Sequence, residues 1–380
     1  MSLHRFATVA CLVATVVWYL NFDADGKLRV SDDESEAVGG GSGSSAPLAP
    51  VAPNRAHVLV TGGAGYIGSH AALALLDAGH TVTVLDNLSR GSAGAIHALR
   101  ALHPHGGRLR FVRADLGVRH AVEGALQRQG GTGPRVDVVM HFAAVAYVGE
   151  SMADPLLYYR NITANTITLL EAMAAAGVSR LVYSSTCAVY GDGAELPITE
   201  DTVPRPTCPY GEAKLMAENV IRAHARSDPS FSATILRYFN VIGSDPDGRL
   251  GEYPRPELRQ HARISGACVR DYIHVADLVA AHLAAMGAPS STPVNPPAVY
   301  NVATGRGVSV RAFVDACRKV TGVDIKVVEQ AEARPGDYSA VWADPAKINR
   351  ELGWAAVYSD VESGLSHAWA WRRKHPHGHQ

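Results

Sequence analysis

A glycine-rich turn constrains this chain more than any other feature of its sequence. The apolar run Val58–Val60 leads into Gly62, Gly65 and Gly68, and a helix-like pattern follows over Ser69–Ala78. Glycine lets a backbone take positive φ and approach a pyrophosphate closely, while a helix N-terminus attracts its negative charge. The pattern therefore predicts a strand, a tight turn and a helix that bind a dinucleotide.

An acidic residue at the end of the next apolar run indicates which dinucleotide is bound. Val82–Leu85 ends in Asp86, where a βαβ unit places the carboxylate that accepts the adenosine ribose hydroxyls. Asp86 would repel a 2′-phosphate, so we expect NAD and not NADP. A structural turn followed by an incidental aspartate is the alternative. The coincidence of strand, glycines, helix and acid favours the cofactor site.

Composition narrows the class of protein. The 380 residues are 47% hydrophobic and 19% charged, which is enough apolar material for a large α/β core. The net charge of −1 gives no reason to expect a nucleic-acid partner. The five cysteines have no CxxC spacing, so we predict free thiols and no metal site.

Strand-like and helix-like segments alternate beyond Arg55. This alternation predicts a parallel sheet covered on both faces, a doubly wound α/β fold. The predicted strands are Val58–Val60, Thr81–Leu85, Leu109–Arg113, Val136–His141, Arg180–Tyr183 and Ala233–Tyr238, and the predicted helices are Ser69–Ala78, Ala121–Gln129, Tyr158–Ala176 and Tyr210–Ala225.

The pattern loosens after Asn240. We predict a cofactor domain over residues 55–240 and a smaller substrate lobe over residues 241–380, with the substrate in the crevice between them. The lobe is expected to contain a strand at Ile325–Val328 and helices at Asp277–Met286, Val310–Val320, Pro345–Leu352 and Val361–Arg373.

The N-terminal 54 residues are not part of this core. Phe6–Leu20 carries no charge and ends in bulky Trp18 and Tyr19, so we interpret residues 1–22 as a short signal-anchor. A cleaved signal peptide and a mispredicted apolar start remain alternatives, and without an anchor the protein would be cytosolic. Arg5 before the run places the remainder in a lumen, and the short span favours the Golgi or endoplasmic reticulum. Residues 23–54 have the composition of a flexible linker.

Two groups of side chains could perform chemistry. Tyr210 and Lys214 lie four residues apart in one predicted helix, so they share a face. A tyrosine with a pKa near 10 is a poor base, but a nearby lysine and a positive nicotinamide ring would favour its phenolate. Tyr183–Thr186 places a cluster of hydroxyls at the end of a buried strand, where they could hold a sugar hydroxyl against the tyrosine. A surface helix and a capping cluster are the structural alternatives.

Together these motifs resemble the UDP-glucose 4-epimerase family, a branch of the extended short-chain dehydrogenase/reductases. The resemblance runs from about His57 to the C-terminus, and residues 237–268 look most like the membrane-anchored UDP-arabinose 4-epimerases of plants and algae. The matching motifs are Thr61–Gly68, Asp86–Asn87, His141–Ala144, Tyr183–Thr186, Tyr210–Lys214, Arg237–Asn240 and Arg270–His274.

The resemblance implies a Rossmann-type sheet and a role for each matching residue. Thr186, Tyr210 and Lys214 would be catalytic. The residues implied to bind NAD are Gly62, Gly65, Tyr66, Ile67, Gly68, Asp86, Asn87, Asp115, Leu116, Phe142, Ala143, Ala144, Asn161, Tyr210, Lys214 and Tyr238. Those implied to bind the UDP-sugar are Thr186, Asn240, Arg270, Arg334 and Asp337.

The resemblance also implies a reaction without net oxidation. Tyr210 takes a proton from the sugar 4-hydroxyl, a hydride passes from C4 to NAD, the 4-keto sugar turns over, and the hydride returns to its other face. NAD therefore stays bound through turnover. The family further implies a homodimer.

Three positions depart from the family pattern. Ala146 stands where many UDP-glucose epimerases carry a lysine near the cofactor. Asn161-Ile162-Thr163 is a glycosylation sequon, which we expect to be unmodified beside the cofactor. Only Ile264–Val269 separates Arg263 from Arg270, where the family has a helix and uridine-gripping strands, so we expect a deletion that weakens UDP binding.

Other functions stay open from the sequence. A UDP-glucose/UDP-galactose 4-epimerase would use the same residues. A dehydratase needs an acid beside the hydroxyl cluster, and Cys187 and Ala188 offer none. The segment after Arg263 would also suit an NAD-binding pseudoenzyme or an inactive isoform.

Overall fold

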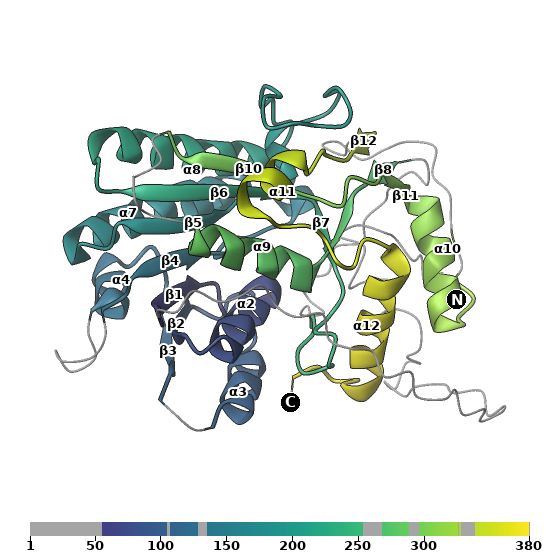
Figure 1. Cartoon of the computed structure of the whole chain (residues 1–380), viewed down its shortest axis with the longest axis horizontal. Helices are drawn as coiled ribbons and strands as arrows, with labels where there is room; N and C mark the ends of the chain where they lie inside the picture. Colours follow the sequence, from purple (N-terminus) through teal and green to yellow (C-terminus); the bar gives the residue numbers. More distant parts are fainter. Residues whose placement is uncertain are drawn as a thin grey trace, which may run out of the picture.

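A twisted parallel sheet forms the centre of the computed structural model (Figure 1), which describes residues 55–104, 107–127, 135–253, 268–288, 296–325, 327 and 339–379. Its seven strands follow the order β10-β6-β5-β4-β1-β2-β3 and every neighbouring pair is parallel. The strands are β1 (His57–Thr61), β2 (Thr81–Asp86), β3 (Leu109–Arg113), β4 (Val138–His141), β5 (Arg180–Ser184), β6 (Ser232–Tyr238) and β10 (Ala298–Val302).

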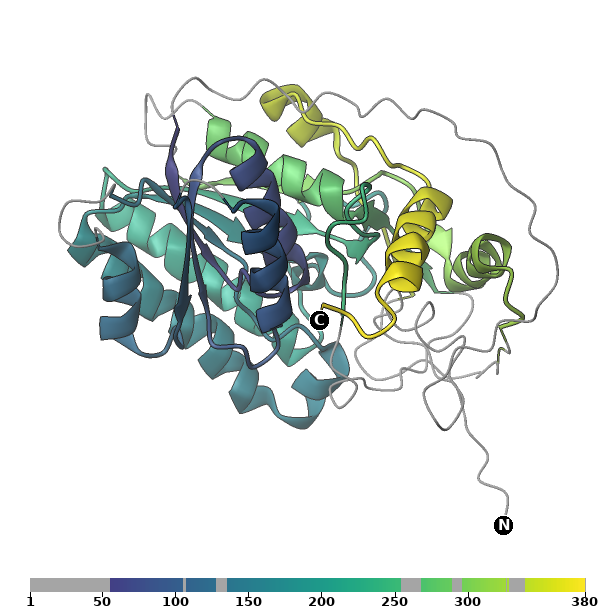
Figure 2. The same ribbon diagram turned by 90° about the horizontal axis from the view of Figure 1, so that it is seen from below.

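Helices cover both faces of this sheet, which explains why its strands are apolar on both sides. On one face α2 (Tyr66–Asp77), α3 (Ala93–Leu102) and α9 (Val275–Gly287) bury side chains against the strands. On the other face lie α4 (Arg119–Leu126), α7 (Asn165–Ala176) and α8 (Pro209–Ser227). Figure 2 shows the purple-blue helices and the teal helices on opposite sides of the strands. The prediction of a doubly wound sheet is confirmed.

The six predicted strands and most predicted helices are present, with shifted ends. The first helix begins at Tyr66, three residues earlier than predicted, because extended Gly65 already serves as its N-cap. The predicted helix over Tyr158–Ala176 is divided. Short helices α5 (Val148–Ala153) and α6 (Pro155–Tyr158) precede a π-helical turn η2 (Tyr159–Ala164), which leads into α7. Such π turns occur often at functional sites.

Two elements of the sheet layers escaped prediction. The sequence pattern predicted no helix where α3 lies, and β10 adds a seventh strand beside β6. Both α9 and β10 come from beyond Asn240 and pack on the large sheet. The chain therefore leaves the large sheet after β6 and returns to it with α9 and β10. The predicted strand at Ile325–Val328 is not seen at Ile325 or Val327, and its other two positions lie outside the described residues.

A smaller group of elements lies beyond the carboxyl ends of the strands. It contains two small sheets, β7 with β9 and β11-β8-β12, and its own apolar cluster. Its elements are β7 (Asn240–Ile242), β8 (Val269–Arg270), β9 (Tyr272–His274), β11 (Val308–Ser309), α10 (Val310–Thr321), β12 (Ala340–Val341) and α12 (Val361–Lys374), while α11 (Ala346–Leu352) packs near β10.

The predictions for the N-terminus fall outside the described residues. Phe6–Leu20 and the linker that follows both precede Arg55. In the ranges that the structure covers, no helix has the length and apolar character needed to span a bilayer.

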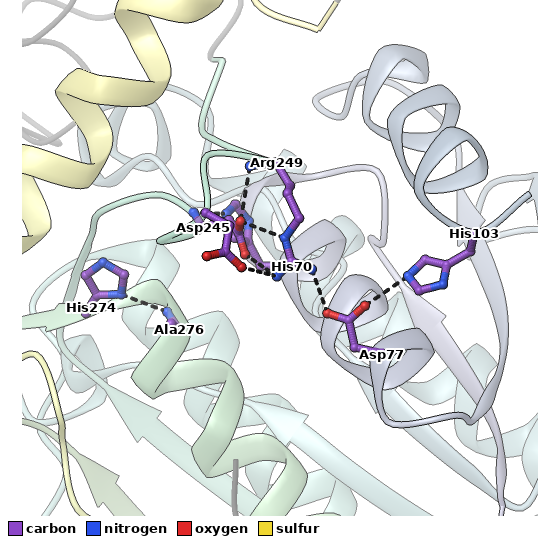
Figure 3. A network of polar contacts seen from close by, with 8 residues as sticks. His70, Asp77, His103, Asp245, Arg249, His274 and Ala276 are labelled. Atoms are coloured by element: carbon purple, nitrogen blue, oxygen red, sulfur yellow. Dashed lines mark hydrogen bonds and ion pairs between the residues drawn. The ribbon is translucent and has the colours of Figure 1, made fainter. Parts of the chain in front are cut away.

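A polar network fixes the first helix of the large sheet to the smaller part of the molecule (Figure 3). The backbone N–H of Asp245 donates to Nε2 of His70 on α2 at 3.2 Å. The guanidinium of Arg249 binds Asp245 at 2.7 Å and Asp77, also on α2, at 2.9 Å. Asp77 in turn contacts His103 after α3 at 3.0 Å. The helix that begins at the glycine turn is therefore attached to the segment after β7.

We expect the protein to lose stability as the pH falls from about 6.5 towards 4. Burial lowers the pKa of His70 and His282 from 6.5 to about 4 and that of His141 to about 3. The unfolded chain therefore binds these protons first, and each histidine contributes stability that is complete above about pH 6.5. Below that pH, each histidine would lower the free energy of unfolding by at most about 1.4 kcal/mol per pH unit, until the pH reaches its pKa in the folded state. Urea unfolding at pH 7.5 and 5.5 measures the loss; equal free energies of unfolding would contradict it.

Candidate active site

The glycine turn lines a cleft at the carboxyl edge of β1, β2 and β4. Gly62 has a φ of 71°, and its N–H donates to the Leu85 carbonyl at 2.8 Å. A Cβ at Gly62 would lie 2.7 Å from the backbone of Ala143, and one at Gly68 would collide with the Gly62 carbonyl. The glycines therefore keep free a space at the N-terminus of α2 that larger residues would fill with their side chains.

Replacing Gly68 by Ala should abolish NAD binding. The new methyl group meets backbone atoms of Gly62 and Gly63, which cannot rotate away as a side chain would. Measured by nucleotide analysis after acid extraction, the purified variant should contain no NAD. Gly124→Ala on α4 is the control, because a Cβ there meets nothing within 4 Å. A Gly68→Ala protein with wild-type NAD content would refute the role of this turn.

The carboxylate predicted to bind ribose lies in the same cleft. Asp86 is buried at the end of β2, where it accepts hydrogen bonds from the N–H groups of Ala64 at 3.0 Å and Leu88 at 2.8 Å. Asn87 donates through Nδ2 to Asp115 at 2.6 Å, which joins the loops after β2 and β3. The predicted ribose and adenine residues are thus brought together, and Leu116 also lines the cleft.

The loop after β4 lines the opposite side. Phe142, Ala143 and Ala144 line the cleft, and Asn161 on the π-helical turn lines it too. The Asn161 amide oxygen accepts the Val145 N–H at 2.8 Å. This hydrogen bond holds the Asn161 side chain against the loop after β4, and the absence of a glycan there stays a prediction.

The three predicted catalytic side chains meet at the far end of the cleft. Tyr210 and Lys214, from the first turns of α8, line it together with Tyr238. Burial raises the pKa of Tyr210 well above its ordinary value, and a hydrogen bond from Thr186 partly opposes this. Thr186 lies two residues after the end of β5 and is itself buried, with its Oγ1 accepting the N–H of Ala188 at 3.2 Å.

Lys214 shares a face of α8 with Tyr210, and its ammonium group contacts the end of β5. Its Nζ donates to the Ser184 carbonyl at 2.7 Å and lies 4.9 Å from the centre of the Tyr183 ring. Burial lowers the pKa of Lys214 to about 7, while the charge of Glu218 opposes the shift. Burial is the main influence on the pKa of Tyr210 in this structure, and the lowering of that pKa by Lys214 together with a bound nicotinamide ring stays a prediction.

The substrate side is visible in part. Asn240 pairs with Tyr272 across β7 and β9, and its N–H donates to the Asp271 carbonyl at 3.0 Å. Arg270 is buried on β8, and its charge partly offsets the burial that raises the pKa of Cys187 to about 12. Arg270 therefore lies near the residue that follows Thr186. Arg334, Asp337 and residues 264–267 of the short segment after Arg263 lie outside the described residues, whereas Val269 begins β8.

Several residues of the cleft were missed by the sequence reasoning. Arg90 and Tyr147 line it, as do Gly251–Tyr253 and His379 from the C-terminal part of the chain. Arg90 follows Asp86 by four residues. A positive charge so close in sequence to the predicted ribose site could have indicated that Arg90 lines the cofactor cleft. No local pattern indicates that His379 approaches Gly251, to whose carbonyl its Nε2 lies at 3.0 Å.

These residues fit NAD. The glycine cradle leaves space that any Cβ would occupy, Asp86 suits a ribose diol, and Tyr210 with Lys214 occupies the end where a nicotinamide would meet a substrate. The fold and this cleft define a dinucleotide-dependent enzyme of the Rossmann type.

Comparison with known proteins supports the assignment to a dinucleotide-dependent enzyme. Residues 58–303 match the NAD dependent epimerase/dehydratase family. A probable UDP-arabinose 4-epimerase 3 of Oryza sativa is 51% identical, covering 89% of this chain and 87% of that protein. UDP-arabinose 4-epimerase 1 of Arabidopsis thaliana is 50% identical, covering 86% and 82%. The crystal structure of UDP-glucose 4-epimerase from Bifidobacterium longum with NAD⁺ and UDP has a TM-score of 0.77 at 34% identity, covering 85% of this chain and 99% of that one.

The chain therefore belongs to the NAD dependent epimerase/dehydratase family. The resemblance to the UDP-glucose 4-epimerases, within the extended short-chain dehydrogenase/reductases, is confirmed. The protein is an isomerase with NAD as its cofactor, a nucleotide-sugar 4-epimerase.

Proposed function

We propose that this epimerase interconverts UDP-xylose and UDP-arabinose. The observation that carries the proposal is a difference in identity between two groups of relatives. Six proteins named as established, probable or putative UDP-arabinose 4-epimerases are 50–52% identical to this chain. Two UDP-glucose 4-epimerases, from Oryza sativa and Bacillus subtilis, are 39% and 40% identical.

The proposed mechanism assigns one task to each side chain. Thr186 holds the sugar 4-hydroxyl, and Tyr210 takes its proton and later returns it. Bound NAD supplies the hydride acceptor and a positive ring that favours the Tyr210 phenolate. Lys214, charged below about pH 7, adds positive potential to the same end of the cleft. Arg270, with Arg334, would clamp the UDP pyrophosphate, because a guanidinium binds phosphate oxygens in pairs.

Turnover of two substrate pairs tests the proposed specificity. Purified protein is incubated with UDP-xylose and with UDP-galactose, and the products are separated by chromatography. We expect UDP-arabinose from the first and a markedly lower kcat/KM for the second. Faster turnover of the hexose would replace the proposal with a UDP-glucose/UDP-galactose 4-epimerase.

The short segment after Arg263 motivates the second candidate, an NAD-binding pseudoenzyme. Calorimetric titration with UDP separates the two. A protein that contains NAD but neither binds UDP nor turns over either sugar is the pseudoenzyme, and UDP binding restored by a homologous insertion after Cys268 would place the defect in this segment.

We further propose a single-pass membrane protein with its catalytic part in the Golgi lumen, working as a homodimer. Residues 55–240 would form most of the cofactor domain, and residues 241–380 the substrate lobe together with α9 and β10 of the large sheet. Phe6–Leu20 and the preceding Arg5 support the topology. Protease protection in sealed microsomes tests it: digestion of the catalytic part without detergent would place that part in the cytosol.

A further inference from the structure

An ion pair joins the two sides of the cofactor cleft. Arg90 belongs to the loop after β2, beside the ribose residue Asp86, and Glu150 belongs to α5, beyond β4. Arg90 Nη2 lies 2.7 Å from Glu150 Oε1, and the two side chains are 26% and 21% exposed. The pair is therefore largely shielded, which distinguishes it from an ordinary surface pair.

Two tyrosines contact the ion pair: the buried Tyr158 contacts Glu150, and Tyr147 contacts Arg90. The Tyr158 hydroxyl lies 2.8 Å from Glu150 Oε2 and 2.7 Å from the Tyr147 carbonyl oxygen, which share its one proton as acceptors, and it accepts the Tyr147 N–H at 3.0 Å. Tyr158 is fully buried. The guanidinium carbon of Arg90 lies 5.6 Å from the centre of the Tyr147 ring, which itself lines the cleft. Glu150 thus presents a fixed carboxylate, and Arg90 lies between it and the cleft.

The small number of positive charges in the cleft suggests a second role for Arg90, which is to bind phosphate. Among the described residues that line it, Arg90 and Lys214 are the only lysine or arginine side chains. Lys214 lies at the catalytic end and donates to Ser184, and Ala146 provides no charge. A dinucleotide carries two negative charges on its pyrophosphate. The five N–H donors of a guanidinium can serve a carboxylate and a phosphate oxygen together.

We propose that Arg90 and Glu150 form a clamp that retains NAD, in which the Arg90 guanidinium binds the charged pyrophosphate while its ion pair with Glu150 holds the two sides of the cleft together. The clamp concerns cofactor retention, so it holds whichever sugar is turned over. It gives the epimerase a means to keep NAD bound while the sugar is oxidised and reduced again.

The rate of NAD release from the full-length holoprotein tests the clamp. Protein loaded with radiolabelled NAD is mixed with excess unlabelled NAD, and the retained label is followed by filtration. Arg90→Gln removes the charge and the pair, so release should accelerate roughly tenfold or more, the range of a charge-assisted hydrogen bond. Glu150→Gln keeps the size of the side chain and loses only the pair, so it should accelerate release by a smaller factor.

The control and the double variant make the test specific. Arg119→Gln breaks a more exposed ion pair of similar length with Glu123 on α4, at 2.8 Å, and Arg119 does not line the cleft. Its release rate should equal that of the wild type. If the two residues act as a pair, the double variant releases NAD no faster than Arg90→Gln alone. Wild-type release from both single variants, or fully additive effects in the double variant, would overturn the proposal. If Arg90→Gln does not fold, Glu150→Gln against Arg119→Gln decides it.

Discussion

Tyr210→Phe is expected to lower the turnover number for epimerisation by about 10²- to 10⁴-fold while NAD stays bound. The phenolic oxygen is the only atom removed, and Tyr210 is the residue to which we assign the proton transfer. The ring remains to pack against Tyr158, 6.2 Å away between centres, so the fold should be kept. Turnover of UDP-xylose and the NAD content of the purified variant are measured together.

A matched control removes a different phenolic oxygen. Tyr300→Phe on β10 loses its 3.0 Å hydrogen bond to Glu351, and Tyr300 does not line the cleft. Its turnover should stay near that of the wild type. A Tyr210→Phe enzyme with an unchanged rate would remove Tyr210 from the role of base.

Glu218→Ala is expected to destabilise the fold by about 3–5 kcal/mol, because it leaves a buried guanidinium without its partner. Glu218 is fully buried on α8, and Arg237 on β6 is 3% exposed. The two form hydrogen bonds of 2.6 and 3.0 Å, and the Ser185 hydroxyl donates to the same carboxylate at 2.6 Å. Burial alone would raise the pKa of Glu218, but the hydrogen bonds and charge of Arg237 bring it below its usual value, so the carboxylate is ionised.

Urea unfolding measures this loss, which is large beside a total stability of roughly 5–15 kcal/mol. Glu123→Ala on α4 breaks a pair whose side chains are 53% and 33% exposed, and it should cost no more than about 1 kcal/mol. Equal midpoints for the two variants would contradict the structural role of the buried pair.

Local chemistry explains what could be predicted from the sequence. Gly62, Gly65 and Gly68 form a tight turn wherever they follow a buried strand, and Asp86 reaches the cleft because the end of β2 lies beside the end of β1. The strands were recognised because burial on both faces gives continuous apolar runs. These features depend on short stretches of chain, so one sequence was enough.

The features that were missed depend on contacts between distant residues. Arg90 meets Glu150 across 60 positions, and Arg237 meets Glu218 from a different element. Neither pairing leaves a local pattern. Lys214 shares a helix face with Tyr210 as predicted, but the Ser184 carbonyl is its nearest acceptor because β5 ends beneath α8. The π-helical turn at Asn161 was likewise invisible, since its apolar spacing resembles that of an ordinary helix.

The fate of the hydrogen at C4 of the sugar tests the central claim most directly. A UDP-sugar that the enzyme turns over is prepared with deuterium at C4 and incubated with the purified protein in ordinary water, and the product is examined by mass spectrometry. If epimerisation proceeds by transient oxidation with one retained NAD, the epimer keeps its deuterium at C4. Exchange of that deuterium for solvent hydrogen, or no epimer from protein with NAD bound, would contradict the account.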